Sequence, residues 1–296
     1  MKKLHVVALG ALLGLAVAAP QASAQVLAVD ELNKIFIAGF ENLYDSTGQA
    51  KAPTVAGLAV GDTLAGIIKV QNISAGLGPD IFSSSPTNQL TGIFAQRIEA
   101  ISNHGPVTHL VFGPAQVNTF CNGADCFSIA GKLSGNEQFA IYLQEGPGTT
   151  EFTEGPTLAQ SVANATDGSL YLTLGYDPGV DGIFGTPDDN GYSYGHPVTD
   201  PLGQPKGEAF GGLNLYTNNT GLLFNKINDP SEFEGDKFVD LYFSAEFEFN
   251  DNPASPWKTA INDPAVVSPF IPEVSSLWML GMGMFSGLGF IRRKSA

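Results

Sequence analysis

The sequence predicts an all-β protein, an antiparallel β-sandwich for which a jelly-roll-like arrangement is one possible form. Three observations lead to this prediction. Several short segments alternate apolar and polar side chains, and turn-forming clusters such as 145–148 and 250–253 separate them. Only one interior stretch, residues 157–165, places apolar residues at helical spacing. Many short strands divided by turns are typical of sandwiches and other closed all-β folds.

The predicted strands follow one another along the chain. They cover residues 63–73, 90–101, 138–144, 170–174, 213–216 and 241–250. The last strand has the clearest pattern, because apolar side chains occupy every second position from Leu241 to Phe249 and polar ones lie between them. That period is typical of an antiparallel strand with one wet face. Residues 30–40 fit either a helix opened by Asp30 or a strand, and residues 46–49 are expected to form a turn.

Both ends of the chain are expected to lie outside the folded domain. Residues 1–24 have a basic start, an apolar run and an Ala-Ser-Ala cleavage site, as in a secretory signal peptide. Near the other end, the apolar run 277–291 is followed by Arg292-Arg293-Lys294. At about 15 residues, this run is shorter than the roughly 20 that span a bilayer comfortably. The basic residues after it favour the cytoplasmic side of a membrane.

Between these ends we expect one domain. The alternating pattern is lost after Asp251, so the β-sandwich domain is placed at 25–262 and a spacer at 263–270. The remaining 271–296 form a C-terminal tail with a single membrane segment. A chain of this length is sufficient for one all-β domain with a sizeable core.

The domain is acidic. The chain holds 14 Lys and Arg against 29 Asp and Glu, a net charge of −15, and both ends of the chain are basic. Such a surface repels nucleic acid, so no nucleic-acid partner is expected. It suits an extracellular protein that meets divalent cations, although acidity also favours solubility in general.

The tail combines three features in a fixed order. Pro272-Glu273-Val274 comes first, the apolar run follows, and Arg292 and Arg293 stand near the end. This order resembles the PEP-CTERM sorting signal of exported bacterial proteins, in which a second proline stands where this chain has Val274. The resemblance implies transient inner-membrane insertion, processing by an exosortase, and delivery to the cell surface or the extracellular space. A plain C-terminal tail anchor is the alternative.

The resemblance also suggests a function. Proteins with this signal are associated with exopolysaccharide, biofilm and floc formation. The chain is therefore expected to be a structural or adhesive protein of the cell surface or extracellular matrix, with exopolysaccharide as a partner and without enzymatic activity. An exported carbohydrate-binding module or carbohydrate-active hydrolase is the alternative. A concave groove with convergent carboxylates or stacked aromatic rings would favour that alternative.

The two cysteines of the chain are close in sequence. Cys121 and Cys126 flank the turn dipeptide Asn122-Gly123. A turn between them can bring their Cα atoms close enough for a bridge. In an exported protein, an even cysteine count at this spacing predicts a structural disulfide, and a metal or redox pair is the less favoured alternative.

One acidic stretch is a candidate metal site. The candidate ligands are Asp177, Asp181, Asp188 and Asp189, which glycines separate. Calcium prefers six to eight oxygen ligands from carboxylates, carbonyls and water. The stretch resembles the Asp-Gly-x-x-Gly-Thr-x-Asp-Asp loops of exported bacterial surface proteins, which implies calcium as a cofactor. A solvated acidic turn is the alternative.

Three further patterns are not expected to carry chemistry. Residues 191–195 match Gly-x-Ser-x-Gly around Ser193, but that motif needs a strand before it and a helix after it, and prolines follow here. His104 and His109 lack a third ligand for zinc. Glu246 and Glu248 share the polar face of the strand at 241–250, and such a face is usually only exposed to solvent. No catalytic residue is therefore predicted.

Overall fold

The computed structural model describes residues 26–104, 107–146, 151–177, 192–199, 204–229 and 237–270. The long strands are β1 (Asn33–Tyr44), β3 (Thr63–Ala75), β5 (Asn88–His104), β6 (Val107–Pro114), β9 (Glu137–Glu145), β10 (Ser169–Gly175), β11 (Tyr192–Thr199), β12 (Pro205–Asn218), β16 (Leu241–Phe249) and β17 (Thr259–Val267). The short ones are β2 (Ala50–Lys51), β4 (Asp80–Ser83), β7 (Thr119–Asn122), β8 (Asp125–Ser128), β13 (Leu223–Phe224), β14 (Ile227–Asp229), β15 (Lys237–Val239) and β18 (Pro269–Phe270).

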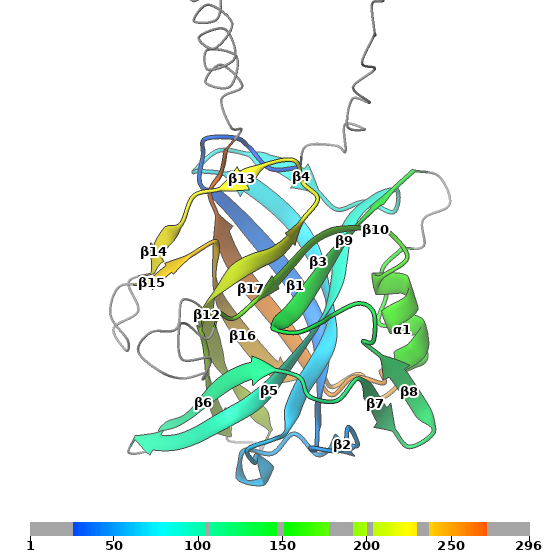
Figure 1. The fold of residues 1–296 in the computed structure, drawn as a ribbon. Helices are drawn as coiled ribbons and strands as arrows, with labels where there is room; N and C mark the ends of the chain where they lie inside the picture. The colour runs from blue at the N-terminus through cyan, green and yellow to red at the C-terminus, as the bar shows by residue number, and fades with distance from the viewer. Residues whose placement is uncertain are drawn as a thin grey trace, which may run out of the picture.

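The long strands, with β2 and β4, form a 12-stranded sheet, and every pairing in it is antiparallel. This sheet closes on itself because two long strands each pair with two neighbours on the same side. The first half of β5 pairs with β9 and its second half with β6. Likewise, β12 pairs with β11 along its first half and with β10 near its end. In the described part of the chain, the closed sheet therefore surrounds one interior (Figure 1). Its wall consists of β1, β3, β5, β12, β16 and β17 throughout. At one level β9 and β10 complete this wall, and at the other level β6 and β11 complete it.

The predicted all-β, antiparallel class is confirmed. Opposite walls of the closed sheet face each other across an apolar interior, as the two layers of a sandwich do, and hydrogen bonds join them at both sides. Of residues 30–40, for which the sequence allows a helix or a strand, 33–40 lie in strand β1. The expected helix is α1 (Leu158–Ala165), which begins after Thr157, whose side chain accepts a hydrogen bond from the Gln160 amide at 3.1 Å.

Side chains of the sheet alternate between two apolar cores. On β3, Ile68 and Val70 point into the interior of the closed sheet, where they join the larger core. Ala65 and Ile67, whose side chains point to the opposite side of the sheet, belong to a second core on the outer face. That outer core lies beneath α1 and the β7–β8 hairpin, which cover this side of the sheet (Figure 1). Because both faces are buried here, the sequence of such strands is apolar at nearly every position.

The predicted spacer at 263–270 is wrong, because these residues belong to the folded domain. Strand β17 lies between β16 and β1 and pairs with both. The following strand, β18, pairs with β13. Just before β17, Trp257 is fully buried in the outer core. The prediction failed because the alternating pattern is lost after Asp251, whereas the chain returns to the sheet at Thr259.

The predicted signal peptide, residues 1–24, and the sorting tail, residues 271–296, lie outside the described residues. The tail includes the membrane segment 277–291 and all of the sorting-motif residues. Among the residues that the structure does describe, no helix is both long enough and apolar enough to cross a membrane.

Candidate functional site

A polar depression of about 560 Å³ lies on the outside of the closed sheet, beside β12 and β15. It is lined by Asp177, Asn214, Leu215, Tyr216, Lys226, Phe238 and Asp240. Strand β12 presents the central residues, the chain just after β10 supplies Asp177, and the region of β14 and β15 supplies the remainder. Segments that are far apart in sequence therefore build the site.

The polar groups in this depression are held in place. The Lys226 ammonium donates to Asp240 Oδ2 at 2.9 Å and also to Asn214 Oδ1. The same oxygen of Asp240 accepts the backbone N–H of Leu215 at 2.9 Å. Asp240 is buried, whereas the Lys226 side chain is half-exposed. The pair is thus fixed from the sheet side and remains open to a ligand from the solvent side.

Two aromatic rings of the depression are exposed to solvent. Tyr216 is 45% exposed and Phe238 is 55% exposed. The Tyr216 hydroxyl donates to the carbonyl oxygen of Tyr176 at 2.8 Å, and this bond fixes the direction of the ring. Burial of the hydroxyl end raises the pKa of Tyr216, so the phenol stays neutral at physiological pH. The depression therefore offers apolar ring surface beside fixed hydrogen-bonding groups.

Of the predicted calcium ligands, Asp177 alone is described, and it lies half-buried at the edge of the depression. Asp181, Asp188 and Asp189 lie outside the described residues. Within the described ranges, no group of three or more His, Cys, Asp or Glu side chains is placed to hold a metal ion. Calcium therefore stays a prediction.

The predicted disulfide is present. Cys121 and Cys126 are joined with an S–S distance of 2.08 Å and a Cα–Cα distance of 4.1 Å, across the β7–β8 hairpin. The neighbouring Asp125 carboxylate accepts the backbone N–H of Leu158 at 2.7 Å. The hairpin thus caps the first turn of α1, and the disulfide stabilises a structural contact rather than a reactive site.

The patterns that were set aside as non-catalytic lie in or beside regular strands. Ser193 is the second residue of β11, opposite Gly211 of β12, so its backbone continues into a strand instead of turning into a helix. The ring of His109 stacks on the ring of His196, with centroids 4.4 Å apart. His104 ends β5, five positions before His109 in the sequence. The Gly-x-Ser-x-Gly match therefore lacks the strand–turn–helix context of a nucleophile elbow.

Sequence reasoning missed the polar depression. Lys226 directly precedes β14 and Phe238 lies within β15, and both strands are too short to give a periodic signal. Tyr216 lies on a predicted strand, but the sequence does not indicate which elements pack beside it. Only the path of the chain brings these residues together.

Comparison with known proteins adds no match. No protein-family model matches the chain. No curated protein matches it in sequence, and no solved structure matches it in fold.

Proposed function

We propose that this protein is an exported, non-enzymatic component of the bacterial cell surface or extracellular matrix that binds exopolysaccharide. The polar depression around Tyr216 and Phe238 is the contact site for the sugar chain. In this proposal the tail with Pro272-Glu273-Val274 delivers the protein, an exosortase processes it after transient membrane insertion, and the domain then contributes to biofilm or floc formation.

The single observation that carries the proposal is the pairing of exposed rings with fixed polar groups. A sugar ring has an apolar face of C–H groups and an edge of hydroxyls. The rings of Tyr216 and Phe238 offer flat apolar surface, and the half-exposed Lys226 ammonium offers a hydrogen-bond donor beside them. Sites that bind small ligands combine apolar lining with a few placed polar groups in this way.

Binding is favoured over hydrolysis by the state of the carboxylates. A glycosidase uses two carboxyl groups, one of which must donate a proton to the leaving oxygen. Asp240 Oδ2 already accepts hydrogen bonds from Lys226 and from the Leu215 amide. With these bonds the Asp240 carboxylate holds Lys226 and β12 in place.

The ends of the domain support display from a single attachment point. The backbone N–H of Asp30 donates to the carbonyl oxygen of Pro269 at 2.9 Å. The described chain therefore begins and ends side by side at one end of the closed sheet (Figure 1). A tail that follows Phe270 would hold the domain by that end and leave the rest of the sheet facing outward.

Calcium is part of the proposal as a stabiliser of the loop that follows Asp177. Bound there by Asp177, Asp181, Asp188 and Asp189, it would fix the edge of the depression. A cation at this edge would also offset some of the repulsion between the acidic domain and an anionic polysaccharide.

Affinity electrophoresis tests the contact site. The mature protein is run in gels that contain a neutral glucan, a galactomannan or alginate, and retardation reports binding. Tyr216→Ala and Phe238→Ala are expected to lose most of the retardation, while Phe36→Ala, which removes a 38% exposed ring from β1, keeps it. Equal retardation of all four proteins would contradict the assigned site. Release of oligosaccharides from any of the polymers would favour the hydrolase alternative.

A further inference from the structure

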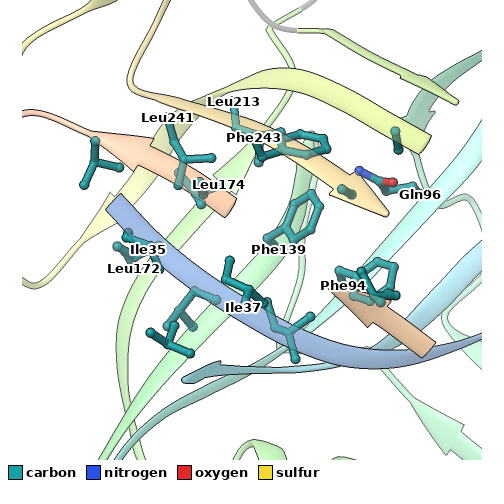
Figure 2. Close-up of a pocket in the computed structure, with 18 of the residues that line it drawn as sticks. Ile35, Ile37, Phe94, Gln96, Phe139, Leu172, Leu174, Leu213, Leu241 and Phe243 are labelled. Carbon is teal, nitrogen blue, oxygen red and sulfur yellow. The ribbon is translucent and has the colours of Figure 1, made fainter. Parts of the chain in front are cut away.

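The interior of the closed sheet contains an apolar cavity of about 120 Å³. Leucine, isoleucine and phenylalanine side chains from nearly every wall line it (Figure 2). Among the side chains labelled in Figure 2, Gln96 alone carries nitrogen and oxygen. In a closed sheet of eight strands, the interior is either just filled by side chains or holds one small ligand. An unfilled space here points to the second case.

Three side chains with a carboxyl or amide group border this cavity, and two of them have partners. Gln96 Nε2 donates to the Tyr176 hydroxyl at 2.5 Å. Asp240 is held by Lys226, as described above. The carboxyl group of the third, Glu41, accepts no hydrogen bond and forms no ion pair with any described residue, although the residue is only 6% exposed. A buried polar group without a partner costs stability, so its presence calls for a ligand.

The backbone directs Glu41 into the cavity. On β1, Ile35, Ile37 and Glu41 occupy alternate positions, and the two isoleucines pack on the inner core. In register with Glu41 lies Gly66 of β3, and beyond it Phe94 of β5. A Cβ atom at Gly66 would come within 2.8 Å of the Phe94 ring, so glycine is required for the ring to occupy this place. Only Gly66, which has no side chain, therefore lies between Glu41 and the Phe94 ring.

We propose that this cavity binds one small, mostly apolar molecule that carries a single neutral hydroxyl or carbonyl group, and that Glu41 forms the hydrogen bond to that group. The apolar walls supply the affinity for the ligand's body, and the carboxyl group supplies its orientation. An apolar cavity of roughly 150 Å³ in another protein stays dry and binds benzene, so a single ring is the size that fits here.

The protonation state of Glu41 selects a neutral ligand. Burial raises the pKa of its carboxyl group to about 8. Near neutral pH the group is therefore mostly protonated and can both donate and accept a hydrogen bond. The protonated carboxyl group can form a hydrogen bond with a neutral alcohol or ketone. A ligand carboxylate would instead have to lose its hydration on entering an apolar space.

Phenol and benzene are the matched probes, because they differ by one hydroxyl group. Binding to the mature protein is followed by NMR of the isoleucine and leucine methyl groups that line the cavity. Phenol is expected to bind about ten-fold more tightly than benzene, since one buried hydrogen bond contributes that much. In Glu41→Leu the ratio is expected to fall to one or below, because the phenol hydroxyl loses this partner, with benzene affinity retained. Glu41→Gln, which keeps a donor and an acceptor, is expected to retain the preference for phenol.

Two controls separate this site from other effects. Glu248→Leu makes the same change at an exposed position of β16 and is expected to leave the phenol preference unchanged. Tyr216→Ala removes the proposed sugar contact and is also expected to leave it unchanged. The proposal is overturned if neither probe shifts the inward methyl groups of the wild-type protein. It is equally overturned if phenol shows no preference over benzene, or if Glu41→Leu keeps that preference.

Discussion

The backbone N–H of Asp30 donates a 2.9 Å hydrogen bond to the carbonyl oxygen of Pro269, near the other end of the described chain. The first and last described segments thus meet at one end of the closed sheet. Residues 259–267, directly before this contact, are a central strand that pairs on both sides. Closure of the sheet therefore depends on the last residues before the sorting tail.

Truncation tests this dependence. We predict that a chain of residues 25–262 does not fold cooperatively, because it lacks the second half of β17 and leaves backbone groups of β1 and β16 unpaired. A chain of residues 25–270 retains β17 and β18 and is expected to show a single thermal transition by circular dichroism. A cooperative transition at the same temperature in both chains would contradict this account.

The buried carboxyl of Glu41 predicts an unusual pH dependence of stability. Its pKa is about 8 in the folded protein, against an ordinary value of 4.5. Between these values the unfolded chain releases the proton while the folded protein keeps it. The contribution of Glu41 to the free energy of unfolding therefore falls as pH rises, by about 1.4 kcal/mol per pH unit.

Urea unfolding of the wild-type protein and Glu41→Gln between pH 4.5 and 8 measures this effect. The amide does not titrate, so the variant is expected to gain stability relative to wild type as pH rises. Glu248→Gln on the exposed face of β16 serves as the matched control and is expected to follow the wild-type profile. Parallel profiles for wild type and Glu41→Gln would show that the carboxyl is ionised in the folded protein.

The disulfide is expected to contribute modestly to stability. The loop between Cys121 and Cys126 is short, and chain-entropy arguments give about 2 kcal/mol for a loop of this size. The double variant Cys121→Ser and Cys126→Ser should therefore unfold at a lower urea concentration and remain folded in buffer. Addition of a reducing agent should destabilise the wild-type protein by the same amount and leave the variant unaffected. A larger loss in the variant alone would point to packing rather than to the cross-link.

Calcium binding predicts a shift in thermal unfolding. A ligand that binds only the folded state raises the unfolding midpoint, so millimolar calcium should raise it relative to EGTA. Asp188→Asn together with Asp189→Asn should remove the shift, because two of the proposed ligands lose their charge. An unchanged midpoint in wild-type protein at millimolar calcium would contradict the calcium proposal.

The strands with one wet face were predictable from the sequence, and those buried on both faces were less so. The alternation from Leu241 to Phe249 marks β16 because outward positions there are exposed. Strand β1 gives no such alternation, since Phe40 packs on the outer core while Ile37 packs inside. Glu41 therefore looked like an ordinary polar residue in a mixed segment. Its burial follows only from closure of the sheet.

The polar depression was not predictable for a different reason. Tyr216, Lys226 and Phe238 come from separate segments. Lys226 precedes the three-residue strand β14, and Phe238 lies in the three-residue strand β15. Local sequence gives the chemistry of each residue and does not give their distance. By contrast, the disulfide was predictable, because Cys121 and Cys126 are joined by a turn that the sequence itself specifies.

The most direct test of the central claim is calorimetric titration of the mature protein with exopolysaccharide purified from a biofilm-forming bacterium, followed by chromatography of the mixture. The account predicts saturable binding that Tyr216→Ala and Phe238→Ala weaken at least ten-fold, with the polysaccharide recovered at its original length. Absence of binding, or recovery of shortened chains, would contradict it.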